Sequence, residues 1–169
     1  MGYTGGVASN PTYRNMGDHT EAMQVDFDPA DIGFEEIASL FWRMHNPCGS
    51  AFSTQYRSAI WYHDPEQQEA LERTLVAVDN QYTGRVTTAV EPLGTFYLAE
   101  NYHQKYRLQS ERALMSAFNA MYPDFEDFNR STAVARLNGF LSGTGSKKLF
   151  EAESESYGLT AEMMAKIRI

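Results

Sequence analysis

The sequence predicts an α+β fold, in which strands alternate with helices over the first part of the chain and helices alone follow. Apolar and polar residues alternate in short segments, apolar residues recur with helical spacing in longer ones, and clusters of proline, glycine and asparagine separate the two kinds. The chain has 169 residues, of which 43% are hydrophobic, so it is long and apolar enough to bury a core of its own.

Short segments with the pattern of strands account for the β part of this prediction. Met23, Val25 and Phe27 alternate with polar residues, which is typical of a half-buried strand that pairs with a neighbour. We expect the strands to form a mixed sheet with helices on one face. The predicted segments are residues 22–28, 56–63, 85–90 and a short apolar stretch at 96–98.

Helical spacing of apolar residues predicts the other elements. Phe34, Ile37 and Phe41 fall on one face of a helix. Asp64 followed by Pro65 is typical of a helix start, because the carboxylate can cap the first turn and proline fits the first helical position. The predicted helices cover residues 34–44, 65–78, 101–106, 110–122, 134–141 and 160–167. In the later helices we expect the core residues to be Phe118, Met121, Leu137 and Leu141.

Charge and cysteine content narrow the class of protein. The formal net charge is −8 and no basic run is present. We therefore do not expect the chain to bind nucleic acid or an anionic membrane surface. The only cysteine, Cys48, excludes an intrachain disulfide, a CxxC redox motif and a zinc site with several thiolates. This cysteine content fits a reducing compartment, so we expect a cytoplasmic protein.

Two candidate functional residues lie near the N-terminus. In the segment "GYTGG", the glycines around Tyr3 allow a tight turn that would hold a phenol in the open, or they form an ordinary glycine turn. Glu21 follows a turn at the start of a predicted strand. Partial desolvation disfavours the charged form of a carboxyl group, so Glu21 could hold and donate a proton; the alternative is a solvated acid or a cap.

A third candidate lies at the mouth of the strand predicted at 56–63. Tyr56 and Arg57 place a phenol and a guanidinium there, in a position where sites are often assembled, although a half-buried tyrosine is the simpler interpretation. Asp18, His19 and Glu21 do not have the spacing of a helical metal motif. We therefore predict no metal and no cofactor.

Five segments, in this order, closely resemble the A-type peptide methionine sulfoxide reductases. They are "GYTGG", "NPTYRNMGDHTEAMQVDFDP", "FWRMHNP", "QYRSAIWYH" and "LAENYHQKY", which extend from Gly2 to Tyr106. The resemblance implies a two-layer, ferredoxin-like mixed sheet with helices. It also implies a reductase-like domain at residues 1–108, incomplete at its N-terminus, and a helical C-terminal extension at residues 109–169.

The resemblance implies a reaction as well. Members of this family use a cysteine thiolate to reduce the S epimer of methionine sulfoxide, free or in oxidised proteins, and so repair proteins after oxidative stress. Thioredoxin or another thiol reductant then restores the enzyme. By motif, Glu21 matches the acid that protonates the sulfoxide oxygen, and Tyr3 and Tyr56 match the hydroxyl groups that bind this oxygen.

The sequence also departs from the family pattern. The family nucleophile lies in a "GCFWG" segment before the glycine-rich motif, and this sequence begins after that point, so we expect it to lack the nucleophile together with one strand and one helix. An aspartate that supports the site in the family has no counterpart, and Ala51 stands nearest to its place. No cysteine near the C-terminus could resolve an intermediate.

Cys48 is then either an inert loop residue or a relocated nucleophile, and no adjacent Lys or Arg would stabilise its thiolate. Two interpretations follow for the chain. It is a reductase whose isolated chain is weak or inactive, or it is a catalytically inactive member that binds methionine sulfoxide or a partner protein.

Overall fold

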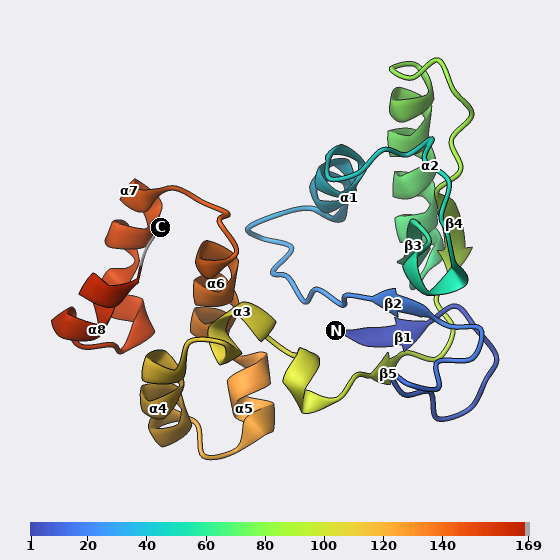
Figure 1. The fold of residues 1–169 in the computed structure, drawn as a ribbon. Coiled ribbons are helices and arrows are strands. Elements are labelled where there is room, and N and C mark those ends of the chain that lie inside the picture. The colour runs from blue at the N-terminus through green and yellow to red at the C-terminus, as the bar shows by residue number, and fades with distance from the viewer. Residues whose placement is uncertain (168–169) are drawn as a thin grey trace. The chain divides into compact units, whose positions relative to one another are not determined.

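The computed structural model describes residues 1–167. These residues form two compact units, Met1–Ala99 and a second unit that begins at Glu100. The first unit contains all the strands of the described residues, and the second is helical (Figure 1). The predicted α+β class is therefore confirmed. Among residues 1–167, no helix is long and apolar enough to cross a membrane. The domain boundary expected after residue 108 stays a prediction.

The first sheet of the N-terminal unit has three short antiparallel strands in the order β2-β1-β5 (Figure 1). Tyr3 of the central strand pairs with Glu21 on one side and with Tyr97 on the other. Residues directly opposite each other in antiparallel strands point to the same face of a sheet, so these three side chains share one face. The bounds are Gly2–Thr4 for β1, Thr20–Ala22 for β2 and Tyr97–Leu98 for β5.

The prediction of a strand at residues 22–28 is wrong. The observed strand β2 ends at Ala22, where the predicted strand begins. Ala22 pairs with Gly2, so only Met1 remains in the described chain to face the residues that follow. Met23 and Val25 are 67% and 50% exposed. The alternation of apolar and polar residues in this segment therefore does not mark a buried face.

A second sheet consists of the parallel strands β3 (Ala59–Tyr62) and β4 (Ala89–Pro92). Both strands are shifted from their predicted bounds. The first begins later than residue 56 because Thr54–Tyr56 forms a 3₁₀ turn, η1. The second begins later than residue 85 because the backbone N–H groups of Thr87 and Thr88 donate to the carbonyl oxygen of Pro47, at 2.8 and 3.2 Å, instead of joining the ladder.

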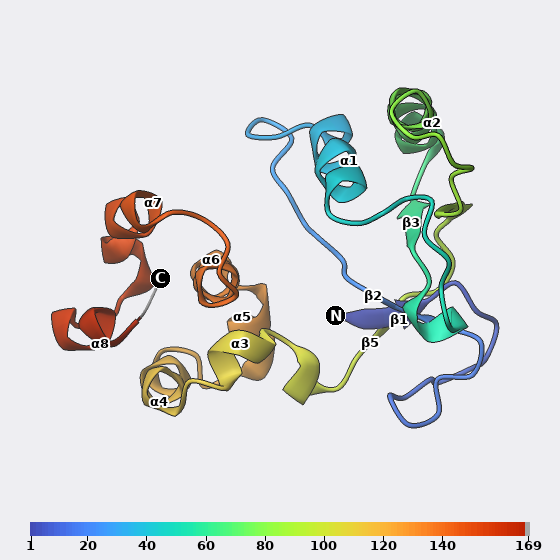
Figure 2. The same cartoon turned by 45° about the horizontal axis from the view of Figure 1, so that its top comes forward.

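Two helices of this unit confirm their sequence predictions. They are α1 (Phe34–Arg43) and α2 (Pro65–Asp79), which connects β3 to β4. The Asp64 carboxylate caps α2 by accepting a hydrogen bond from the backbone N–H of Gln67 at 2.8 Å. The two helices lie side by side (Figure 2). Trp42 of α1 donates a buried hydrogen bond to Thr74 of α2 at 2.9 Å.

The C-terminal unit is formed by helices around a core of its own. The helix predicted at 101–106 is divided, because Lys105 has a φ of 48° and separates a 3₁₀ turn from the following helix. The bounds are Asn101–His103 for η2, Tyr106–Gln109 for α3, Arg112–Met121 for α4, Phe125–Arg130 for α5, Thr132–Leu141 for α6, Lys147–Ala152 for α7, Ser154–Tyr157 for η3 and Ala161–Lys166 for α8.

The core of this unit is apolar and aromatic. Phe118 and Leu137, which the helical spacing predicts as core residues, are fully buried. Met121, predicted in the same way, is 39% exposed, and Leu141 is only partly buried. The buried members of the core are Leu108, Leu114, Phe118, Phe128, Val134, Leu137, Phe140, Phe150 and Tyr157.

Candidate functional site

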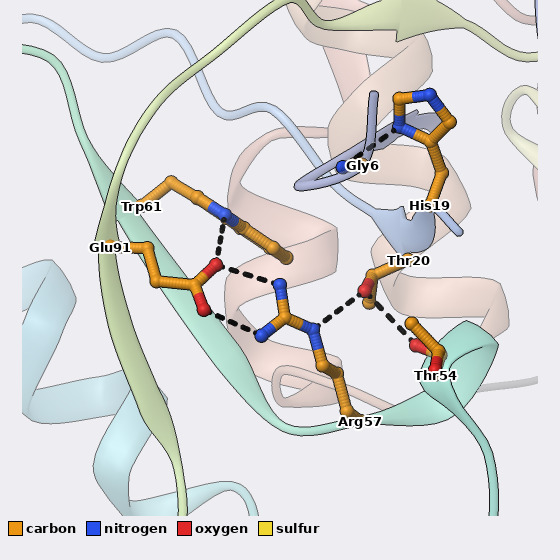
Figure 3. A network of polar contacts seen from close by, with 7 residues as sticks. All are labelled: Gly6, His19, Thr20, Thr54, Arg57, Trp61 and Glu91. Carbon is orange, nitrogen blue, oxygen red and sulfur yellow. Dashed lines mark hydrogen bonds and ion pairs between the residues drawn. The ribbon is translucent and has the colours of Figure 1, made fainter. Parts of the chain in front are cut away.

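The glycine-rich segment is attached to the residues before β2 through His19 (Figure 3). Nδ1 of this buried ring accepts a hydrogen bond from the Gly6 N–H at 3.2 Å, so Nε2 carries the proton and donates to the Ala8 carbonyl at 2.7 Å. The Asp18 carboxylate accepts from the N–H groups of Val7 and Ala8. These backbone hydrogen bonds hold the pKa of Asp18 below its ordinary value.

Tyr3 is not held in the open, which corrects the expectation drawn from the glycines around it. Its side chain is 2% exposed and packs in a small cluster with Met16, Tyr97 and Ala99. The reason is this packing, because side chains point away from the plane of a sheet and are buried by what lies on that face. The strand register nevertheless places Tyr3 directly opposite Glu21.

Glu21 and Tyr56 are brought together by a residue that lies between them. The Nε2 group of Gln55 donates to Glu21 Oε1 at 2.8 Å and to the Tyr56 hydroxyl oxygen at 2.9 Å. Glu21 is half-buried, whereas Tyr56 is 45% exposed. The exposed Phe52 ring contacts the Tyr56 ring, with centroids 5.4 Å apart. A carboxyl group and a phenol are thus linked at one solvent-accessible place.

A fourth side chain, Tyr13, joins this group. Its hydrogen bond with the Tyr56 hydroxyl raises the pKa of Tyr56, and desolvation and the negative charge of Glu21 act in the same direction. A hydrogen bond raises the pKa of a phenol when it stabilises the neutral form. Tyr56 therefore keeps its proton and remains a hydrogen-bond donor.

Arg57 connects the same region to the second sheet (Figure 3). Its two terminal nitrogens donate to both oxygens of the Glu91 carboxylate, at 2.6 and 2.7 Å. The guanidinium carbon lies 5.6 Å from the centroid of the Trp61 ring, and the indole N–H donates to Glu91 at 3.2 Å. The hydrogen bonds from Arg57 hold the pKa of Glu91 below its ordinary value, although burial acts in the opposite direction.

Thr20 extends this network to the turn that carries Gln55. Its hydroxyl accepts a hydrogen bond from Arg57 Nε at 2.9 Å and donates to the carbonyl oxygen of Thr54 at 3.0 Å (Figure 3). The turn η1 is therefore fixed to β2 beside Glu21. Gly5 lies against the same arginine, and two features of this position favour glycine. Its φ is +81°, and a Cβ there would lie only 2.7 Å from Arg57 Nη2.

Cys48 lies on a different part of the N-terminal unit. Its half-buried thiol donates a hydrogen bond to the carbonyl oxygen of Gly84 at 3.3 Å, in the connection between α2 and β4. Its backbone N–H donates to the side chain of Asn46 at 3.1 Å. These contacts attach the thiol to residue 84 rather than to Gln55 and its partners. The role of Cys48 stays a prediction.

The structure includes partners of the candidate residues to which the sequence analysis assigned no role. These are Gln55 and Tyr13, which contact Tyr56, and Glu91, which pairs with Arg57. Gln55 and Tyr13 lie inside the family motifs quoted above, so the sequence contained a signal for them. Glu91 lies outside these motifs. Among residues 1–167, no group of three or more His, Cys, Asp or Glu side chains is placed to hold a metal ion.

Fold and geometry define an α+β protein in which a single glutamine amide links a carboxyl group to a phenol. Comparison with known proteins gives its family. The family model described as "Peptide methionine sulfoxide reductase" matches residues 1–135. The chain therefore belongs to the peptide methionine sulfoxide reductase family.

Individual relatives agree with this assignment. The chain is 41% identical over 162 residues to a peptide methionine sulfoxide reductase of Drosophila melanogaster, a match that covers 95% of this chain and 65% of the relative. It is 36% identical over 148 residues to peptide methionine sulfoxide reductase A5 of Arabidopsis thaliana, covering 82% of this chain and 56% of the relative. The chain thus spans less than two thirds of the length of both relatives.

A solved structure gives the same result for the fold. The crystal structure of Mxr1 from Saccharomyces cerevisiae, in its reduced form, superposes with a TM-score of 0.59 at 28% sequence identity. The superposition covers 66% of this chain and 69% of the yeast chain. The likeness extends the family assignment from the sequence to the three-dimensional fold.

Proposed function

We propose that this chain acts in the thiol-dependent reduction of methionine S-sulfoxide, free or in oxidised proteins, to methionine. Glu21 is the proposed acid, and the hydroxyl groups of Tyr3 and Tyr56 are the proposed donors to the sulfoxide oxygen. The observation that carries the proposal is the hydrogen-bonded group of Glu21, Gln55 and Tyr56 in a chain of this family.

The chemistry explains why such a group is needed. A thiolate attacks the sulfoxide sulfur, the S–O bond breaks, and the oxygen passes to the attacking sulfur as a sulfenic acid while methionine is released. A second thiol then forms a disulfide with that sulfur, and the oxygen leaves as water. Negative charge develops on the oxygen during the attack, so preorganised donors and an acid lower the barrier.

The reducing equivalents come from a thiol reductant. Thioredoxin or another thiol reductant is the proposed partner, and the proposed role is repair of oxidised proteins in the cytoplasm. No nucleic acid and no membrane surface is part of this proposal, since the chain carries a net charge of −8.

The position of Cys48 favours a second candidate function for these 169 residues taken alone. Cys48 is their only cysteine, and its thiol contacts Gly84 instead of the group around Gln55. The isolated chain would then bind methionine sulfoxide, or a partner protein, with little or no turnover. Any reduction that it performs would need a thiol other than Cys48.

Binding of methionine S-sulfoxide tests the proposed function, and turnover by the isolated chain separates reduction from binding alone. Calorimetric titration with the S and R epimers of methionine sulfoxide should show preferential binding of the S epimer. Glu21→Gln should retain that binding within about threefold and Glu69→Gln, an exposed control on α2, should not change it. Equal binding of the two epimers, or none, would contradict the proposed function.

Turnover is measured as production of methionine from the S epimer in the presence of dithiothreitol. The purified chain and its Cys48→Ser variant should both show little or no activity. Steady activity that disappears in the Ser variant would instead identify Cys48 as the nucleophile and would overturn the binding-only alternative.

A further inference from the structure

We propose that Gln55 is a positioning residue, which holds the Glu21 carboxyl group and the Tyr56 hydroxyl together so that both can reach one substrate oxygen. This inference rests on the proposed function. It is carried by the two hydrogen bonds that the side-chain amide of Gln55 makes, at 2.8 Å to Glu21 and 2.9 Å to Tyr56.

The amide of Gln55 uses both of its N–H groups in these contacts. A carboxylate can only accept hydrogen bonds, so the nitrogen and not the oxygen of the amide must face Glu21. With one N–H directed to Glu21 and the other to Tyr56, the separation of these two groups is set by the width of a single NH₂ group.

This arrangement determines where the Tyr56 proton is available. The hydroxyl oxygen accepts from Gln55, so its own O–H is directed elsewhere. In the structure, the hydrogen bond to Tyr13 favours the neutral phenol, as expected when Tyr56 donates to the Tyr13 oxygen. A sulfoxide oxygen, which is a stronger acceptor than a phenol, would take the place of Tyr13.

The same logic applies to the acid. Oε1 of Glu21 accepts from Gln55, so Oε2 is the carboxyl oxygen that does not contact this amide. In the proposed function, Oε2 is the oxygen from which the acid donates. Gln55 therefore leaves Oε2 of Glu21 and the O–H of Tyr56 available to the substrate oxygen.

Gln55 can do this because its backbone is held in place. It is the middle residue of η1, and the hydroxyl of Thr20 donates to the carbonyl of Thr54 at 3.0 Å. On the other side, Arg57 donates to the same hydroxyl at 2.9 Å. The turn is thus fixed to β2 on both sides of Gln55, next to Glu21.

The test replaces Gln55 by methionine, which has a similar length but no N–H group, and by alanine in case methionine perturbs the fold. Gln68→Met is the matched control, because Gln68 donates a similar amide-to-carboxylate hydrogen bond to Glu72, at 3.0 Å, on the surface of α2. Each variant is labelled with ¹³C at tyrosine Cζ, and the resonance that Tyr56→Phe removes identifies Tyr56.

Both Gln55 variants should raise the midpoint of the Tyr56 titration by about 1 pH unit, because the phenolate loses an N–H donor. They should also weaken binding of methionine S-sulfoxide by about five- to tenfold. Gln68→Met should change neither quantity. A residue with a merely structural role would lower the urea midpoint of unfolding without moving the Tyr56 titration.

The outcomes distinguish this inference from the function on which it rests. If the wild-type chain binds the sulfoxide and the Gln55 variants match Gln68→Met in both measurements, the role of Gln55 is overturned and the proposed function stands. If the wild-type chain does not bind the sulfoxide, the proposed function itself is overturned, whatever the Tyr56 titration shows.

Discussion

Replacing Glu91 by glutamine tests whether the Arg57 network stabilises the N-terminal unit. Glu91 accepts two hydrogen bonds from Arg57 and one from Trp61. Glutamine has nearly the same shape, but its NH₂ group would face a donor of the guanidinium. The substitution therefore removes the attraction between the charges of Arg57 and Glu91. It also leaves at least one N–H of the Arg57 guanidinium without an acceptor.

The expected loss is about 1–2 kcal/mol in the free energy of unfolding. Hydrogen bonds to charged groups contribute about 1.5–3 kcal/mol when buried. The side chains of Arg57 and Glu91 are 23% and 36% exposed, so solvent screening reduces the effect toward the lower end. In a unit of this size, each 1 kcal/mol lowers the melting temperature by about 4–8 °C.

Tryptophan fluorescence during urea unfolding provides the assay. Both tryptophans of the chain, Trp42 and Trp61, lie in the N-terminal unit and report on its unfolding. Glu35→Gln is the matched control, because Glu35 pairs with Arg73 in the same unit and both side chains are at least half exposed. The control should change the stability by less than about 0.5 kcal/mol.

The loss of stability caused by Glu91→Gln should become smaller at acidic pH. Glu91 has a folded-state pKa below its ordinary value of 4.5, so its contribution is fully present above that pH and is lost as the pH falls toward the lower folded-state pKa. The difference between wild type and Glu91→Gln should thus be constant at neutral pH and should shrink below about pH 4.5. A difference that is equal at pH 3 and pH 7, or no larger than that of Glu35→Gln, would refute this reasoning.

Two further predictions concern a helix cap and the C-terminal core. Asp64→Ala removes the cap of α2 and should lower the stability of the N-terminal unit by about 1 kcal/mol, measured by tryptophan fluorescence, whereas an unchanged urea midpoint would show that the cap contributes nothing. Phe118→Ala leaves a cavity in the helical core and should cost about 3–5 kcal/mol, visible as lost amide exchange protection in α4 and α6; full protection in these helices would contradict the burial of Phe118.

The helices were predictable because their signals are local. The apolar spacing of α1 and the cap and proline at the start of α2 act within a few residues of each other. The division of residues 101–106 at Lys105 could not be read in this way, since a positive φ at lysine has no local sequence signal.

The strands were harder to predict because each is short and depends on its partner. The segment after Ala22 has a clear alternation but finds only Met1 opposite it in the described chain. Residues 85–88 are β-prone, yet Thr87 and Thr88 bind the carbonyl of Pro47 instead. Register and pairing are properties of two segments, and the pattern of one segment does not contain them.

Some features of the candidate site could also be predicted from the sequence, whereas others could not. Motifs alone select Glu21 and Tyr56, and the structure places both on the amide of Gln55. Arg57 and Glu91 form an ion pair although they lie far apart in the sequence, and no sequence pattern predicts this pairing. The exposure expected for Tyr3 was wrong, because its side chain packs against Met16 and residues near β5 that lie far away in the sequence. The catalytic roles of these residues stay predictions.

The most direct test is a crystal structure of this chain with methionine S-sulfoxide bound. The sulfoxide oxygen should lie within hydrogen-bond distance, about 2.5–3.2 Å, of the Glu21 carboxyl group and the Tyr56 hydroxyl, and Tyr3 should contribute the third donor. Binding at another place, or an oxygen that contacts neither Glu21 nor Tyr56, would contradict the proposed site.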